Sequence, residues 1–208
     1  MTATENRRFL LAERPEGRAV KESDFRLDSA PVAAPGDGQI LIRTLFLSLD
    51  PYMRGRMSAA RSYAPPVELG AVMTGEVVGE IVESRAPGLA PGDIVLAYAG
   101  WQEYATLPAK AVERVDRTQL GNLPLSYLLG VLGMPGATAY FALDTIGKPK
   151  AGETVLISAA AGAVGHGPAQ GGSAAPGMRS HADRVERHLG ELRARLDRDP
   201  RRHDLDLS

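Results

Sequence analysis

Residues 154–165 read Thr154-Val155-Leu156-Ile157-Ser158-Ala159-Ala160-Ala161-Gly162-Ala163-Val164-Gly165. The first five residues are largely apolar on both faces, as expected for a central strand of a parallel sheet. A buried strand that ends in a turn of small residues is typical of the start of a dinucleotide-binding βαβ unit. Gly162 would let the backbone approach a pyrophosphate, and Gly165 would let a following helix pack closely on the strand. Ala160 stands where the usual fingerprint has its first glycine.

The segment after this turn does not continue the pattern. Gly167, Pro168, Gly171 and Gly172 follow, and three glycines in a helix interior cost about 3 kcal/mol relative to alanine. Residues 166–208 also contain none of the chain's Ile, Phe, Tyr, Trp, Thr or Lys, yet they hold all four histidines. No two of these histidines are spaced i, i+4, so we do not expect a metal site. We interpret 166–208 as a tail that is disordered or helical.

Upstream of residue 125 the sequence is rich in strand patterns broken by Gly and Pro. The expected strands are 39–49, 72–82, 94–98 and 101–107, the last two forming a hairpin around Gly100. Gly75 and Gly79 lie inside one of them, which predicts bulges or close backbone packing. Short strands at this spacing favour a small barrel.

From residue 125 onward the pattern becomes helical. We expect helices over 126–132 and 137–146, separated by a turn at 133–136 because Pro135 lacks a backbone donor and Gly136 breaks a helix.

Composition excludes several classes of protein. The 208 residues carry 24 basic and 25 acidic side chains, a net charge of -1, so we expect no nucleic-acid or membrane partner. The chain has no cysteine, which excludes disulfides, thiolate nucleophiles and cysteine-ligated metals. No apolar run is long enough to span a bilayer, and the N-terminus lacks the apolar stretch of a signal peptide. We therefore expect a soluble, cytoplasmic protein.

Several stretches are similar to motifs of one enzyme family. They are Leu47-Ser48-Leu49-Asp50-Pro51-Tyr52-Met53-Arg54-Gly55-Arg56-Met57, Gly70-Ala71-Val72-Met73-Thr74-Gly75, Gly100-Trp101-Gln102-Glu103-Tyr104-Ala105 and Leu132-Gly133-Met134-Pro135-Gly136-Ala137-Thr138-Ala139-Tyr140-Phe141. Residues 149–165 continue the similarity, which covers 1–165 without a gap. On these motifs the chain resembles the zinc-independent medium-chain dehydrogenase/reductases, in the leukotriene 12-hydroxydehydrogenase, prostaglandin reductase and 2-alkenal reductase branch. Residues 1–165 also lack the Cys and His ligands that zinc-dependent relatives need.

The resemblance implies a mainly β GroES-like barrel over 1–125. Residues 126–165 would then be linking helices and the first βα element of an incomplete Rossmann (α/β) domain, and 166–208 a tail outside the family pattern. It also implies NADPH as cofactor and reduction of the C=C bond of α,β-unsaturated ketones or aldehydes by hydride transfer. Because the family pattern ends at Gly165, we expect a truncated chain, and we hypothesise a shifted reading frame or a gene truncation, which the nucleotide sequence would test.

The resemblance assigns three groups of site residues. Tyr52 would face the nicotinamide end of a cleft and bond the cofactor or polarise a carbonyl; the alternative is an aromatic that caps the barrel. Met134, Pro135 and Thr138 would line the cleft near the nicotinamide, or would form a plain interhelical turn. The pyrophosphate would be bound by backbone N–H groups of Ala161, Gly162, Ala163, Val164 and Gly165. Arg54 and Arg56 are weaker candidates for a phosphate or carboxylate.

Two functions of different class remain open. The first is an NADPH-dependent ene-reductase, and the second is a catalytically inactive truncated remnant or binding module. For the chain acting alone we expect the second, because a central strand without neighbours leaves backbone groups and an apolar face exposed. Such a surface would also permit pairing with a second copy, so a homodimer stays open. A co-chaperonin-like role would rest on the barrel fold only.

Overall fold

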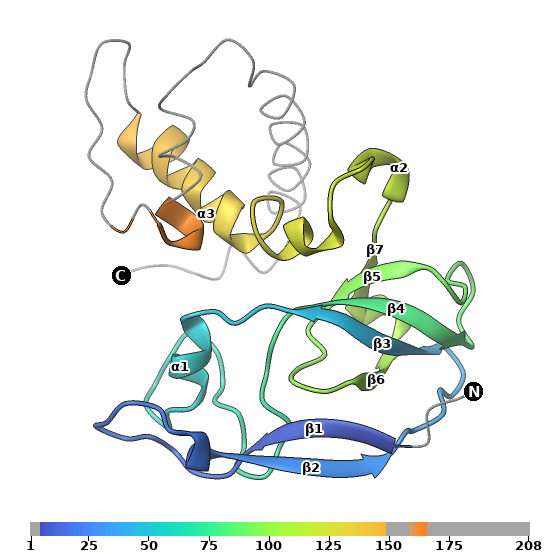
Figure 1. Cartoon of the computed structure of the whole chain (residues 1–208), viewed down its shortest axis with the longest axis horizontal. Helices are drawn as coiled ribbons and strands as arrows, with labels where there is room; N and C mark the ends of the chain where they lie inside the picture. Colours follow the sequence, from blue (N-terminus) through green and yellow to red (C-terminus); the bar gives the residue numbers. More distant parts are fainter. Residues whose placement is uncertain (1–4, 149–158, 160, 166–208) are drawn as a thin grey trace. The chain divides into compact units, whose positions relative to one another are not determined.

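The computed structural model describes residues 5–148, 159 and 161–165. The chain divides into two units, Met1–Ser126 and Tyr127–Ser208, and each is treated by itself below. Strands dominate the first unit, and the described part of the second unit is helical (Figure 1).

The first unit begins with a two-stranded antiparallel ribbon. Strand β1 (Glu5–Leu11) pairs with β2 (Phe25–Pro31), and the connection between them contains the short 3-10 helix η1 (Glu22–Asp24). Arg8 lies opposite Asp28 in this register, and their side chains form an ion pair at 2.7 Å. Cross-strand pairs of opposite charge favour one register of a ribbon.

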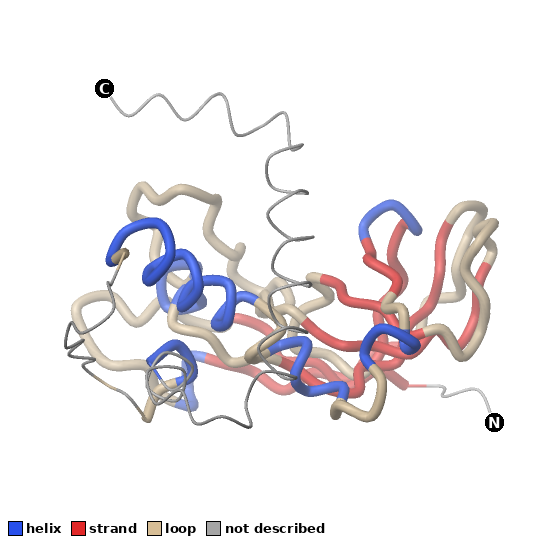
Figure 2. The backbone as a smooth tube through the Cα atoms, turned by 90° about the horizontal axis from the view of Figure 1, so that it is seen from above, coloured by secondary structure: helices blue, strands red, loops and turns tan. Residues whose placement is uncertain are grey.

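A curled five-stranded antiparallel sheet follows, and its strands are drawn in red in Figure 2. The order of the strands in the sheet is β6-β3-β4-β5-β7. Its strands are β3 (Gln39–Leu47), β4 (Val77–Ser84), β5 (Ile94–Ala97), β6 (Tyr104–Pro108) and β7 (Val112–Arg114), with the 3-10 turn η2 (Ala109–Ala111) between the last two. The inward-facing side chains form one core cluster of Ile40, Ile42, Val77, Ile81, Val95, Ala97, Ala99 and Ala105. This is the GroES-like half-barrel that the resemblance implies.

The predicted hairpin around Gly100 is wrong. Strand β5 pairs with β4 and β7, whereas β6 pairs with β3. Gly100 has φ +79°, and its N–H donates to the carbonyl of Gly75, while the next N–H, of Trp101, donates to that of Met73. The chain therefore turns toward the segment before β4 instead of folding back on β5.

A second core cluster lies under the helix α1 (Tyr52–Arg56). Leu11, Met53, Met57 and Met73 are buried there, and Phe25, Tyr52, Val67 and Trp101 pack against them. The ring of Trp101 stacks on that of Phe25 with a centroid separation of 5.1 Å. The ribbon contributes to this cluster because the N–H of Phe9 donates to the carbonyl of Trp101. Helix α2 (Arg117–Leu120) follows the sheet, and Asp116 caps its N-terminus through the N–H of Thr118.

In the second unit, the turn predicted at 133–136 is wrong. The helix α3 (Met134–Phe141) starts inside that stretch, after the 3-10 helix η3 (Leu125–Leu129), and it continues as one π-helical turn, η4 (Ala142–Gly147). Pro135 is tolerated because the N–H groups of a first turn have no intrahelical acceptor. A β-carbon at Gly136 would lie 1.9 Å from the carbonyl oxygen of Val131, so close packing explains this glycine. The strand expected over 154–158 and the tail lie outside the described residues.

Candidate functional site

Tyr52 lies at the first position of α1, where the chain leaves the sheet. Strand β3 ends at Leu47, and the N–H of Ser48 donates to the carbonyl of Glu76 at 3.0 Å. Pro51 precedes the helix with φ −56°, a value that suits a helix start. The N–H of Met53 then donates to the carbonyl of Asp50 at 3.1 Å, which closes the turn. The tight turn at Asp50-Pro51 thus places Tyr52 at the end of the sheet, at the start of α1.

The Tyr52 hydroxyl is buried and has no hydrogen-bond partner within the described part of the chain. Burial raises the pKa of Tyr52 to about 12. Tyr98 and then two carboxylates, Asp50 and Glu76, add to this shift. The phenol is therefore neutral at physiological pH and keeps a proton that it can donate. An unpaired buried hydroxyl is costly, and a ligand that supplies an acceptor would relieve the cost.

Two further polar atoms near this helix are buried and unpaired among the described residues. One is Oδ2 of Asp50, an acceptor, and the other is Nε1 of Trp101, a donor. Burial, with the charge of Asp50 as the next cause, also raises the pKa of the Glu76 carboxyl. The surroundings of Tyr52 therefore combine neutral donors with acidic groups.

Gly75 lets three elements meet beside Tyr52. A β-carbon there would lie 2.6 Å from Cδ1 of Leu47, 3.1 Å from Cδ1 of Trp101 and 3.2 Å from Cε of Met53. These separations are shorter than ordinary carbon contacts. The close packing that the sequence predicts at Gly75 is thus observed, but Gly75 lies before β4 and not inside a strand as predicted. At Gly79 a β-carbon would lie 2.9 Å from Cδ1 of Ile42, which confirms the same prediction there.

The two arginines of α1 have different surroundings. Arg54 donates to the backbone carbonyl of Pro15 at 2.5 Å, so it holds protein backbone and is not a free anion-binding group. The guanidinium carbon of Arg56 lies 5.8 Å from the Tyr52 ring centroid and 4.8 Å from that of Tyr63. Nη1 of Arg56 also donates a long hydrogen bond, 3.4 Å, to the carbonyl of Pro65. The guanidinium of Arg56 therefore lies over the rings of Tyr52 and Tyr63 as a cation–π contact.

The remaining predicted site residues belong to the second unit. Met134 and Thr138 lie one helical turn apart on α3, both exposed, and Oγ1 of Thr138 donates to the carbonyl of Met134 at 2.8 Å. Pro135, in contrast, is buried. The structure thus places Met134 and Thr138 on one exposed face of the helix, and Pro135 on its packed side.

The glycine-rich turn is described over 161–165. The N–H of Gly162 donates to the carbonyl of Ala159 at 2.8 Å, and 163–165 have helical backbone. Residues 161–164, Ala161 to Val164, are exposed and Gly165 is half-buried. The pyrophosphate role that the resemblance assigns to 161–165 stays a prediction.

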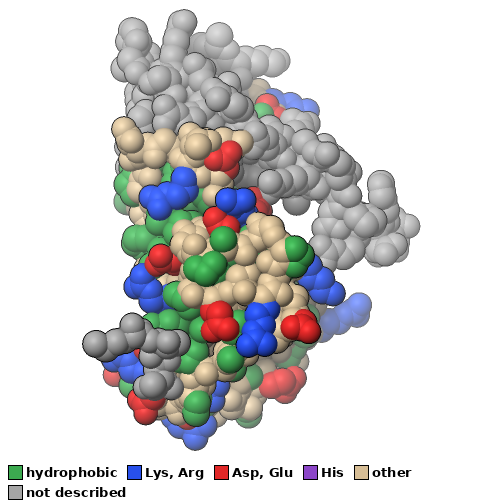
Figure 3. Space-filling view, turned by 90° about the vertical axis from the view of Figure 1, so that its right-hand side faces the viewer, with side chains coloured by type: hydrophobic (Ala, Val, Ile, Leu, Met, Phe, Trp, Pro, Cys, Tyr) green, Lys and Arg blue, Asp and Glu red, His purple; other side chains and the backbone are tan. Residues whose placement is uncertain are grey.

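A surface cavity of about 470 Å³ lies elsewhere in the first unit and contains none of the predicted site residues. It is lined by Gly92, Asp93, Ile94, Arg114, Val115, Asp116, Arg117 and Thr118. Over the described ranges, no cluster of three metal-ligating side chains occurs, and no helix is long and apolar enough to cross a membrane. On the face drawn in Figure 3, acidic and basic side chains are interspersed and do not form a patch of one sign.

The half-barrel is the N-terminal domain of a medium-chain dehydrogenase/reductase of the zinc-independent type. Residues 7–115 match the family model described as the N-terminal domain of oxidoreductase, and the chain belongs to this family. This confirms the resemblance drawn from the motifs.

Individual relatives place the chain within the predicted branch. It is 53% identical over 162 residues to NADPH-dependent curcumin reductase of Escherichia coli (strain K12), covering 77% of this chain and 45% of that protein. It is 39% identical over 154 residues to 2-alkenal reductase (NADP(+)-dependent) of Nicotiana tabacum, covering 70% and 43%. The solved structure of CurA in complex with NADPH from Vibrio vulnificus superposes with a TM-score of 0.72 at 45% identity, covering 80% and 48%. The chain therefore spans about half the length of the relatives that it matches.

Proposed function

We propose that this chain supplies the substrate-binding part of an NADPH-dependent reductase of α,β-unsaturated ketones and aldehydes. The observation that carries the proposal is the Tyr52 hydroxyl, which is neutral, buried and unpaired among the described residues. A carbonyl oxygen is the acceptor that such a donor lacks. Two relatives, a curcumin reductase and a 2-alkenal reductase, have names that are consistent with conjugated carbonyl substrates.

In this proposal Tyr52 donates a hydrogen bond to the substrate carbonyl oxygen and polarises the conjugated C=C bond. NADPH, when bound, supplies the hydride that adds to the β-carbon. The π electrons then move toward the carbonyl oxygen, and the Tyr52 donor stabilises the resulting enolate charge. With a pKa near 12, Tyr52 keeps its own proton, so the α-carbon takes its proton from water.

The cofactor would be held by the second unit. The N–H of Gly162 already donates to the carbonyl of Ala159, so the N–H groups of Ala161, Ala163, Val164 and Gly165 would bind the pyrophosphate. The first N–H groups of a helix lack intrahelical acceptors, and 163–165 have helical backbone. Met134 and Thr138 present an exposed face that would line the nicotinamide end.

A second candidate function is binding without turnover. In that case the Tyr52 hydroxyl would hold the carbonyl oxygen of the compound, and no hydride transfer would follow. Cytoplasmic localisation and a homodimer stay predictions of the sequence.

The deciding experiment combines NADPH titration by fluorescence with NADPH consumption in the presence of methyl vinyl ketone, for the whole 208-residue chain and for Tyr52→Phe. Turnover that falls by a factor of about 100 to 1,000 in the variant supports the reductase, since this is the usual cost of losing one oxyanion donor. Enone binding without turnover, weakened in the variant, supports the binding module. A folded chain that binds neither compound contradicts both.

A further inference from the structure

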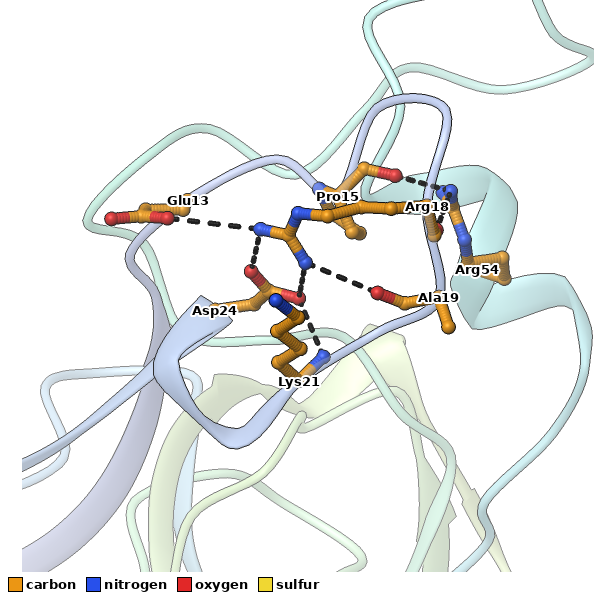
Figure 4. Close-up of polar contacts among 7 residues, drawn as sticks. All are labelled: Glu13, Pro15, Arg18, Ala19, Lys21, Asp24 and Arg54. Carbon is orange, nitrogen blue, oxygen red and sulfur yellow. Dashed lines mark hydrogen bonds and ion pairs between the residues drawn. The ribbon is translucent and has the colours of Figure 1, made fainter.

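The connection between β1 and β2, here called the 12–24 loop, closes on an ion pair between half-buried Arg18 and buried Asp24. Asp24 is fully buried, and its carboxylate accepts from Nη1 of Arg18 at 3.0 Å and from Nη2 at 2.5 Å (Figure 4). The N–H of Lys21 donates to the same carboxylate at 2.8 Å. A two-point guanidinium–carboxylate contact has a defined geometry, so it fixes the course of the loop around Pro15 and Arg18.

Arg54 joins this loop to helix α1. Its Nη2 donates to the carbonyl of Pro15 at 2.5 Å and to that of Arg18 at 3.3 Å, and Figure 4 shows its side chain reaching from the helix to both. No ion pair is recorded for Arg54 in the described part of the chain, so its polar contacts there are to the loop backbone. The acceptors are presented by the same stretch of loop that the Arg18–Asp24 pair fixes.

A second arginine attaches the other end of the helix. Arg14, at the start of the 12–24 loop, donates to the carbonyl of Met57 at 3.2 Å and to that of Val67 at 2.9 Å. Helix α1 has only five residues. Helices this short are not stable by themselves, so their orientation is set by tertiary contacts. The contacts from Arg54 and Arg14 therefore set how Tyr52 is presented.

We propose that Arg54 is a positioning residue for Tyr52: by binding the carbonyls of Pro15 and Arg18, it holds α1 so that the Tyr52 hydroxyl stays in its buried, unpaired position. The role of Tyr52 toward a carbonyl rests on the proposed function, whereas the mechanical link from the loop to α1 does not. Arg54 itself touches no reacting atom in this account.

The consequence is a change at Tyr52 when Arg54 loses its donors. Arg54→Met keeps an unbranched side chain as far as the position of Nε but removes both contacts with the loop. Helix α1 is then free to shift, and water reaches the Tyr52 hydroxyl, which is the buried atom of this half-buried residue. Arg54→Lys retains one charged donor and should preserve part of the link. Arg61 is exposed and has no recorded contact in the described structure, so Arg61→Met is a matched control.

The experiment uses the whole chain labelled with ¹³C-tyrosine, with the Tyr52 resonance assigned by its absence in Tyr52→Phe. A soluble paramagnetic agent reports how far solvent reaches each tyrosine ring, and Trp101, the single tryptophan, reports by its emission whether the core is folded. We expect the relaxation of Tyr52 by the agent to rise at least twofold in Arg54→Met, less in Arg54→Lys, and not at all in Arg61→Met. If the Trp101 emission shows that Arg54→Met is unfolded, the relaxation of Tyr52 in Arg54→Lys is compared with that in wild type instead.

The proposal is overturned if Arg54→Met is folded and the relaxation of Tyr52 is unchanged. If Arg54→Met is unfolded, unchanged relaxation of Tyr52 in Arg54→Lys overturns it. This outcome differs from a failure of the proposed function, in which the wild-type Tyr52 resonance does not respond to methyl vinyl ketone. In the enone titration, the positioning role predicts weaker binding in Arg54→Met with partial recovery in Arg54→Lys.

Discussion

The Tyr52 hydroxyl and Oδ2 of Asp50 are both buried at the start of α1, and neither has a hydrogen-bond partner among the residues described. One is a donor and the other an acceptor, separated by Pro51. Folded proteins leave few such atoms unpaired, because each costs about 1–3 kcal/mol. A ligand that supplies an acceptor would satisfy the Tyr52 hydroxyl, as the proposed function expects.

Replacing Tyr52 by Phe should lower the affinity for an enone without lowering the stability of the fold. The variant removes a hydroxyl that has no partner, so the free energy of unfolding should stay the same or rise by about 1 kcal/mol. Enone affinity should fall by roughly 2- to 10-fold, the effect of one neutral hydrogen bond. Urea unfolding followed by Trp101 emission, together with enone titration, measures both. A variant that loses stability and keeps its affinity would make Tyr52 a packing residue.

Gly75→Ala should destabilise the first unit by about 1–3 kcal/mol, because the new methyl group would lie 2.6 Å from Cδ1 of Leu47. Gly55→Ala is the matched control. Gly55 lies in α1 with no atom within 4 Å of its β-carbon position, so alanine should leave stability unchanged or raise it by up to about 1 kcal/mol. The difference in urea midpoint between the two variants measures the effect. Equal midpoints would mean that Leu47, Trp101 and Met53 can move apart without cost.

Asp24 should make the stability of the chain depend on acid pH. Its hydrogen bonds from Arg18 lower the pKa of the Asp24 carboxyl below its ordinary value. A carboxyl whose pKa is lower in the folded state stabilises the fold above its unfolded pKa of about 3.9, and this contribution is lost as pH falls through the folded pKa. Asp24→Asn should therefore be less stable than wild type at neutral pH, and the difference should shrink in acid. A difference that is constant with pH would show that the charge of Asp24 does not contribute.

Glu76 should change the stability of the chain with pH in the direction opposite to Asp24. Burial raises the pKa of its carboxyl, so the folded state holds the proton more tightly than the unfolded state. The contribution of Glu76 to the free energy of unfolding is fully present below the unfolded pKa of about 4.3. It is lost as pH rises through the folded pKa. Glu76→Gln should therefore unfold at higher urea than wild type at neutral pH, with a smaller difference in acid. A lower urea midpoint at neutral pH would contradict this account of Glu76.

Local sequence patterns predicted the positions of the strands more reliably than they predicted which strands pair. Strands at 39–49 and 94–98 were visible because β-branched and apolar residues end at Asp50-Pro51 and Gly100. Their partners depend on long-range backbone bonds, such as that from Gly100 to Gly75, which no local pattern contains. The ribbon β1–β2 was missed because its charged residues, Arg8 and Asp28 among them, hide the alternation. Their cross-strand pairing is a tertiary signal.

For the site, the sequence identified Tyr52 through a family motif and not through its chemistry. The buried and unpaired state of its hydroxyl depends on how α1 packs against Met73 and Trp101, which are distant in sequence. Asp50, Glu76 and the positioning contacts of Arg54 were missed for the same reason. One local signal was available: Asp50, Arg54 and Arg56 cluster around Tyr52 at helical spacing within one short motif.

The central claim is that the Tyr52 hydroxyl donates to the carbonyl of a conjugated ketone. Titrating methyl vinyl ketone into the ¹³C-tyrosine-labelled chain tests it most directly, because each of the six tyrosines reports separately. We predict a saturable change at Tyr52 that is larger than at any other tyrosine, with weaker binding in Tyr52→Phe. Saturable enone binding that leaves the Tyr52 resonance unmoved, with equal affinity in Tyr52→Phe, would contradict the account.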